Sequence, residues 1–204
     1  MKQIDFWFDP ASTYSYVSAM RIASAAAPRS VAVRWRPFLL GPIFRAQGWN
    51  TSPFNLFPEK GRYMWRDMQR LCEEAGIPFR AAVPEKGMFP RNSLLAARAS
   101  LAALDEGWGE EFVRVLYQAQ FGDWSDISDP DVIAGTAVQL GQDGDRLLAG
   151  AGADAVEARL RANTEGAQAR GIFGAPSFLV GDELFWGNDR LEQALDWAQC
   201  EGMN

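Results

Sequence analysis

Polar and apolar side chains alternate over residues 3–8, and this pattern predicts a β-strand. A turn at residues 9–12 follows it. From Thr13 onward, apolar side chains recur at helical spacing with no proline before Pro28, so the next element is expected to be a helix. Residues 31–36 predict a second strand. Strand, helix and strand in this order are typical of the start of a βαβ unit.

The middle of the chain has the pattern of a helical region. Residues 41–58 are expected to form a loop, because prolines and glycines interrupt them. Asp129 is expected to cap one of the helices, and Pro130 fits its first turn. The helical spacing that follows the loop predicts helices at residues 63–75, 92–104, 110–120, 131–140, 143–149 and 153–170.

The last part of the chain returns to strands. Residues 177–180 and 183–186 are apolar runs on either side of a Gly-Asp turn, which predicts a hairpin. Residues 187–189 are expected to cap a final helix over 190–198. Neither end of the chain has enough strands for a stable sheet, so the two ends must pair.

The expected fold class is therefore α/β: a sheet of order β-α-β … β-β-α, interrupted by an all-helical insertion. We expect residues 1–43 and 171–204 to form the domain that holds the sheet. Residues 44–170 are then expected to form the helical insertion domain.

Composition narrows the chemistry. The 204 residues include no histidine, which excludes Ser-His-Asp and Cys-His catalytic centres. Cys72 and Cys200 are too far apart for a Cys-x-x-Cys pair, and two cysteines without histidine disfavour the usual zinc sites, so we expect no metal. Catalysis then needs a carboxylate, a lysine, a tyrosine or a nucleophile brought in from outside.

Net charge and hydropathy disfavour some classes of binding partner and some cellular locations. The net charge of -6 disfavours nucleic acid and anionic membranes as partners. The N-terminal pattern does not resemble a signal peptide, and no segment approaches the roughly 20 apolar residues that cross a bilayer. We therefore expect a cytoplasmic protein.

Ser12 lies where a strand ends and a helix is expected to begin. The free N–H groups and the positive end of the helix dipole stabilise an anion at such a place. On its position alone, the favoured interpretation of Ser12 is a simple helix cap, and the two features that follow shift the balance towards a ligand site. A second feature is Ala175-Pro176 before a strand, where a cis peptide would leave the Ala175 N–H and C=O free for an extended peptide.

A third loop, over residues 187–190, begins another expected helix. Its backbone N–H groups suit a carboxylate, and Asp189 suits an ammonium group. Three loops at one end of a sheet would together hold a short zwitterionic peptide.

Residues 5–16, with Ser12 near their centre, resemble the opening of the 2-hydroxychromene-2-carboxylate isomerases and of the related kappa-class glutathione transferases. Thr13 stands where those families have a proline. The resemblance implies a thioredoxin-like sheet with a helical insertion, glutathione as cofactor and usually a homodimer. It continues in the same order through residues 48–50, 58–64, 89–94, 126–130, 171–177 and 185–191.

The resemblance also implies roles for single residues. Ser12 would hydrogen-bond the glutathione sulfur, and Ala175 would make main-chain contacts beside a cis Pro176. The remaining glutathione contacts would come from Asn50 and Lys60 at the backbone and glycyl carboxylate, and from Asn188 and Asp189 at the γ-glutamyl end. Each has a plain alternative: Asn50 as a turn residue, Lys60 as a solvated lysine, Asp189 as a helix cap.

For the substrate, the candidates are aromatic and polar side chains in the same segments. Pro90 together with Asn92 looks like the isomerase branch. Asn92 would bind a polar group of the substrate, and Arg91 is a further candidate for its carboxylate. The residues expected to stack on an aromatic substrate are Tyr14, Phe89 and Trp124.

The expected function is a glutathione-dependent isomerase, acting on a small aromatic carboxylate of the 2-hydroxychromene-2-carboxylate or benzylidenepyruvate type. The resemblance places such a reaction in aromatic hydrocarbon catabolism. The alternatives are a kappa-type glutathione transferase and a non-catalytic binding protein of thioredoxin fold.

Overall fold

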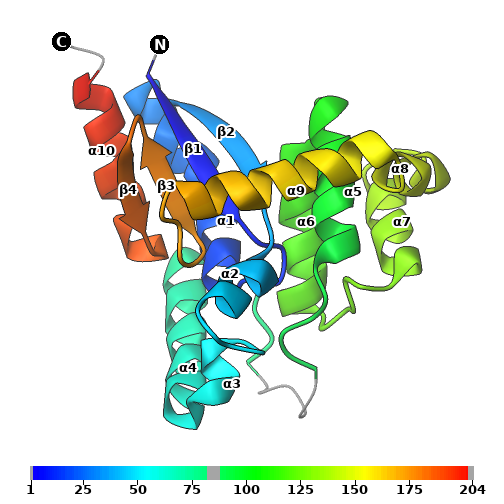
Figure 1. The fold of residues 1–204 in the computed structure, drawn as a ribbon, viewed down its shortest axis with the longest axis horizontal. Coiled ribbons are helices and arrows are strands. Elements are labelled where there is room, and N and C mark those ends of the chain that lie inside the picture. The colour runs from blue at the N-terminus through cyan, green and yellow to red at the C-terminus, as the bar shows by residue number, and fades with distance from the viewer. Residues whose placement is uncertain (1, 82–87, 202–204) are drawn as a thin grey trace.

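The sheet is built from both ends of the chain. The computed structural model describes residues 2–81 and 88–201. Its four strands lie in the order β2-β1-β3-β4 (Figure 1). Strand β1 pairs with β2 in parallel and with β3 antiparallel, and β3 pairs with β4 antiparallel. The predicted pairing of the two ends is confirmed. The strands are β1 (Gln3–Phe8), β2 (Ala32–Pro37), β3 (Ser177–Val180) and β4 (Glu183–Trp186).

Helices fill the chain between β2 and β3, as expected. Asp129 caps α7 by accepting a hydrogen bond from the Asp131 N–H, and Pro130 begins that helix. Short 3-10 helices lie at Ala27–Arg29 and Asn188–Arg190. The α-helices are α1 (Thr13–Ala26), α2 (Leu40–Ala46), α3 (Pro53–Leu56), α4 (Pro58–Ala75), α5 (Leu94–Asp105), α6 (Gly109–Gly122), α7 (Pro130–Gln139), α8 (Gly144–Ala151), α9 (Asp154–Ala169) and α10 (Leu191–Glu201).

Helices cover both faces of the sheet, and the alternation along β1 explains the layers. The Phe6 and Phe8 side chains belong to the main core, which includes residues of α1 and α10. Trp7 points the other way, into a smaller core with Ala167 of α9, the helix that crosses the sheet in Figure 1. Phe6 stacks on Phe178 of β3 with ring centroids 5.5 Å apart. Burial of these rings fixes the register of the central strands.

The expected loop over residues 41–58 is wrong, because α2 and α3 lie there and α4 begins at Pro58. The first turn of α2 has no side-chain cap of its own. Instead, the Leu40 N–H donates to the Asp9 carboxylate at 2.7 Å. A cap from a residue so distant in sequence leaves no local signal. Helix α3 did have such a signal, since Ser52 accepts from the Phe54 N–H and Pro53 follows it.

The start of the final helix also differs from the expectation. Residues Asn188–Arg190 form a 3-10 turn, and no side chain caps it. Helix α10 begins after this turn, at Leu191. Within the described ranges, no helix combines the length and the apolar character that a membrane span requires. The division into domains at residues 43 and 171 stays a prediction.

Candidate functional site

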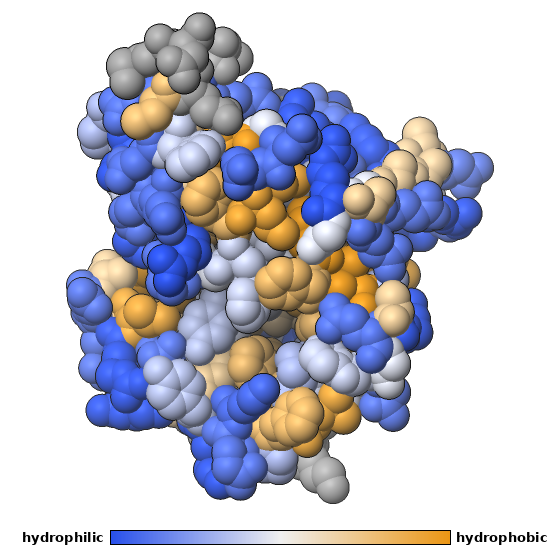
Figure 2. Space-filling view, turned by 60° about the vertical axis from the view of Figure 1, so that its left-hand side comes forward, coloured by the Kyte–Doolittle hydropathy of each residue, from blue (hydrophilic) through white to orange (hydrophobic). Residues whose placement is uncertain are grey.

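A cavity of about 2060 Å³ opens where β1 ends and β3 begins. Its wall combines the turn after β1 with the start of α1, the segment from α2 into α4 as far as Leu71, the segment before α5, and the loops on either side of the β3–β4 hairpin. Figure 2 shows a face on which apolar side chains gather around a hollow between polar margins. The three loops that the sequence singled out thus meet at one site.

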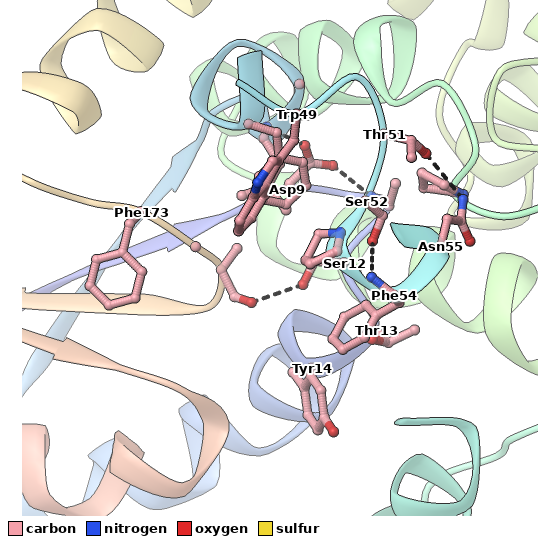
Figure 3. A pocket seen from close by; sticks show the side chains of 18 of the residues that line it. Asp9, Ser12, Thr13, Tyr14, Trp49, Thr51, Ser52, Phe54, Asn55 and Phe173 are labelled. Atoms are coloured by element: carbon pink, nitrogen blue, oxygen red, sulfur yellow. Dashed lines mark hydrogen bonds between the residues drawn. The ribbon is translucent and has the colours of Figure 1, made fainter. Parts of the chain in front are cut away.

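Ser12 is the N-cap of α1 and also reaches across the cavity wall. Its Oγ accepts a hydrogen bond from the Ser15 N–H at 3.3 Å. The same hydroxyl donates to the Ala175 carbonyl oxygen at 3.1 Å (Figure 3). A hydroxyl has one proton, and Ser12 gives it to the Ala175 carbonyl, so donation to a ligand requires the hydroxyl to change its acceptor. The cap interpretation is confirmed, and it leaves the donor role open.

The Ala175-Pro176 peptide is cis. The Ala175 carbonyl accepts from Ser12, and the Pro176 carbonyl accepts from the Gly187 N–H at 3.0 Å. The Ala175 N–H makes no hydrogen bond to a described residue. A second cis peptide, Phe89-Pro90, also lies in the cavity wall, and nothing in the sequence indicated that it is cis.

Asp9 is a structural member of the site that the sequence analysis treated only as a turn residue. Its carboxylate accepts from the Ala11 N–H at 2.8 Å and from the Leu40 N–H at 2.7 Å. Its carbonyl accepts from the Tyr117 hydroxyl at 2.8 Å. Burial raises the pKa of Asp9, although hydrogen bonds to Leu40, Ala11 and Ser93 oppose this effect. Asp9 therefore fixes the Ser12 turn to α2.

Because burial raises the pKa of Asp9, we expect the unfolding free energy to depend on pH. A carboxyl whose pKa is higher in the folded than in the unfolded protein binds its proton more tightly when folded, so stability falls as pH rises through the folded pKa. From about pH 4 upward, the unfolding free energy of the wild type should fall relative to Asp9→Asn, which cannot titrate. Urea unfolding between pH 4 and pH 7 measures the difference.

The matched control is Asp182→Asn, at an exposed hairpin turn. It gives the change in pH slope that follows from the loss of one exposed carboxyl, and the effect of Asp9→Asn is compared with that change. Parallel slopes for the wild type and Asp9→Asn would show that Asp9 has the same pKa in the folded and the unfolded chain.

The structure brings the sequence-predicted residues to the cavity wall, with one exception. Trp124 is not part of the wall, and its ring packs on Trp65 at 5.5 Å between centroids. Trp65 in turn meets Phe89 edge-on at 5.0 Å. The predicted residues in the wall are Ser12, Tyr14, Asn50, Lys60, Phe89, Pro90, Asn92, Ala175, Pro176, Asn188 and Asp189, and Arg91 joins them.

Several of these side chains already hold protein partners. The Tyr14 hydroxyl donates to Asp67 at 3.0 Å, and burial together with that carboxylate raises the pKa of Tyr14. Asn92 accepts from the Leu94 N–H at 3.0 Å, so its oxygen holds the start of α5. Arg91 pairs with Asp126 at 3.0 Å.

The charged candidate residues differ in whether they already form an ion pair within the protein. The Lys60 ammonium lies 4.8 Å from the Phe57 ring centroid and pairs with no described carboxylate. Asp189 pairs with Arg190 at 3.2 Å, at a site where its side chain is 73% exposed. Asn50 is exposed. Lys60 is therefore available to an anionic ligand. The Asp189 carboxylate, in contrast, would have to bind a ligand while it also pairs with Arg190.

Sequence reasoning missed other parts of the wall. Arg45 of α2 lines the cavity and forms no ion pair with a described carboxylate. Phe173 and Trp186 pack together at 4.8 Å between centroids, yet 46% and 52% of their surfaces remain exposed. Trp186 lay within a motif that the sequence analysis recognised, but the motif did not show which way its ring points.

The cavity has no thiol of its own. Cys72 is buried in the core, and burial raises the pKa of its thiol to about 12. Cys200 is exposed on α10. Neither belongs to the cavity wall. A sulfur that reacts in this cavity must therefore arrive with a ligand.

The chain belongs to the family described as the DSBA-like thioredoxin domain, whose profile matches residues 3–197. The expected α/β fold with a thioredoxin-like sheet and a helical insertion is thereby confirmed. Within this family the similarity extends to named enzymes, and it covers almost the whole chain.

A 2-hydroxychromene-2-carboxylate isomerase of Sphingobium xenophagum is 30% identical over 195 residues, which cover 94% of this chain and 95% of that protein. The protein called glutathione s-transferase kappa 2 of Caenorhabditis elegans is 27% identical over 206 residues, covering 96% and 91%. A solved structure of a 2-hydroxychromene-2-carboxylate isomerase superposes with a TM-score of 0.82 at 27% identity, covering 98% and 96%. The isomerase family recognised from the sequence is confirmed, and these relatives support an isomerase.

Proposed function

We propose that this chain is a glutathione-dependent isomerase for an aromatic carboxylate of the 2-hydroxychromene-2-carboxylate or benzylidenepyruvate type. One observation carries the proposal: the Ser12 hydroxyl stands at the N-terminus of α1 in a cavity that has no thiol. The relatives named above point in the same direction. We place the isomerase in the cytoplasm as a homodimer, in a pathway of aromatic catabolism.

The residues of the wall fit glutathione. This ligand is an extended peptide with carboxylates at both ends, an ammonium group and a thiol. The Ala175 N–H, beside a cis peptide, is a free main-chain donor for it. Lys60 and Asn50 suit its glycyl end, and Asn188 and Asp189 suit its γ-glutamyl end. Cations near carboxylates and a carboxylate near an ammonium give the charge pairs that such a ligand needs.

Ser12 would act as a hydrogen-bond donor and not as a nucleophile. The absence of histidine removes the base that a nucleophilic serine needs. When bound, glutathione supplies a thiolate that adds reversibly to a conjugated carbon, so that rotation and elimination change the alkene geometry. Ser12 and the N-terminal N–H groups of α1 stabilise the negative charge on the sulfur.

The remaining wall would bind the substrate. Phe89 offers a ring, held in place by Trp65, for stacking on an aromatic substrate. Tyr14 offers a second ring, held by its bond to Asp67. The side-chain NH₂ group of Asn92 would donate to a polar group of the substrate, beside Pro90. Arg91 would bind the carboxylate of the substrate. Trp124 would not contact the substrate and would act only by packing on Trp65.

A kappa-type transferase is the second candidate, because the chain is similar to a kappa-class relative over nearly its full length. The two functions share one site and differ in the fate of glutathione. A non-catalytic binding protein of the same fold is the third. Thr13, in place of the family proline, does not by itself favour it, since its hydroxyl donates to the Met64 sulfur at 3.2 Å inside an intact turn.

Product analysis separates the three. With 2-hydroxychromene-2-carboxylate and glutathione, we expect a rearranged substrate and full recovery of the free thiol. A stable thioether with equal loss of thiol would establish the transferase. Calorimetry without heat of binding at millimolar glutathione, together with no turnover, would leave only the third candidate.

A further inference from the structure

Asn188 is oriented by two side chains of α1. The Ser18 hydroxyl donates to Asn188 Oδ1 at 3.0 Å, and Arg21 Nη1 donates to the same oxygen at 3.3 Å. Ser18 is 0% exposed and Asn188 is 5% exposed, so the bond between them lies away from water, whereas the bond from Arg21 is only partly buried. Arg21 is itself held by an ion pair with Glu192 of α10.

These contacts fix the orientation of the Asn188 side-chain amide, with its oxygen towards α1. A guanidinium has donors and no acceptor, so the atom that Arg21 contacts must be the oxygen of Asn188. The nitrogen then points away from α1. It makes no hydrogen bond to a described residue, and Asn188 is part of the cavity wall.

We propose that Ser18 and Arg21 are positioning residues that make Asn188 a hydrogen-bond donor to the ligand in the cavity. The group that binds there must then be an acceptor. Asp189, the next residue, offers an acceptor instead. A donor beside an acceptor suits the α-carboxylate and the α-ammonium of an amino acid. This inference rests on the proposed function and assigns the α-carboxylate of the γ-glutamyl residue to the Asn188 nitrogen.

The test compares two variants with a matched control. Asn188→Asp keeps an oxygen for Ser18 and Arg21 but replaces the donor by a charged acceptor. Ser18→Ala removes one of the two bonds that hold the amide. Ser24→Ala is the control, because Ser24 lies on α1 and donates only to the Arg21 carbonyl at an exposed position.

Calorimetric titration supplies the readout, with glutathione and with an analogue in which a hydrogen replaces the α-carboxylate. For glutathione, we expect Kd to rise roughly 10–150-fold in Asn188→Asp and roughly 2–12-fold in Ser18→Ala. Ser24→Ala should match the wild type. For the analogue, Ser18→Ala and Ser24→Ala should match the wild type, because the carboxylate that Asn188 contacts is missing. Asn188→Asp should bind the analogue at least as well as the wild type does, because its new carboxylate faces the ammonium that the analogue keeps.

A general loss of structure would weaken both ligands, so selective loss for glutathione identifies the positioning role. Wild-type binding that neither variant changes would overturn this inference and leave the proposed function standing. Equal losses for both ligands would also overturn it. A wild type that does not bind glutathione would overturn the proposed function, and this inference with it.

Discussion

Ser12→Ala is expected to lower turnover about 10–150-fold, because a hydrogen bond to a charged group contributes about 1.5–3 kcal/mol. The same loss should raise the pKa of the bound glutathione thiol by about 1–2. The lost donor is the hydroxyl that now bonds to the Ala175 carbonyl at 3.1 Å. Steady-state kinetics and titration of the thiolate by its ultraviolet absorbance measure the two effects.

Ser12 also caps α1, so the two roles must be separated. Ser12→Gly removes the hydroxyl but keeps an acceptable N-cap, whereas alanine is a poor one. Both variants should therefore lose the same turnover. Only Ser12→Ala should also lose about 0.5–2 kcal/mol of unfolding free energy. A glycine variant with wild-type turnover and an unchanged thiol pKa would reduce Ser12 to a helix cap.

Ser12→Cys should change the chemistry of the cavity from addition to disulfide exchange. A cysteine at a helix N-terminus has a lowered pKa and is a reactive thiolate. It would attack a sulfur of oxidised glutathione, form a mixed disulfide and release the other half as a thiolate. Mass spectrometry should find one glutathione attached at position 12, removable by dithiothreitol, and isomerase turnover should be lost.

The other cysteines set the controls for this experiment. Cys72 should not compete, because burial raises the pKa of its thiol to about 12. Cys200 is exposed, so the experiment uses a Cys200→Ser background. That background alone should remain unmodified. A Ser12→Cys chain that also remains unmodified would mean that position 12 does not face the sulfur of bound glutathione.

Local signals in the sequence predicted most of the fold. Alternation marked β1, the Gly-Asp turn marked the hairpin, and Asp129 with Pro130 marked the start of α7. Helix α2 was not predicted, because the N–H of its first residue, Leu40, donates to Asp9, which lies in another loop. Helix α3 has a local cap at Ser52, but the surrounding prolines favoured a loop.

The sequence predicted which loops form the site, but it predicted few of the side-chain contacts between them. The position of Ser12 followed from the strand–helix junction, but its bond to Ala175 depends on the tertiary fold. Trp124 looked like a substrate contact because it is aromatic, whereas its ring packs on Trp65. Arg45 lay in a supposed loop, so nothing indicated that α2 places it at the cavity. The bonds of Ser18 and Arg21 to Asn188 join segments that sequence spacing cannot relate.

The pairing of β1 with β3 has a consequence for the synthesis of the protein. Ser12 and Ala175 lie 163 positions apart, so the cavity cannot close until Ala175 has left the ribosome. At about 5–20 residues per second, β1 waits roughly 10–30 s for β3. During that time Phe6 and Phe8 lack the cover of β3 and α10, and one edge of β1 is unpaired. A nascent chain stalled within α9 would thus be a client for chaperones and not a small version of the enzyme.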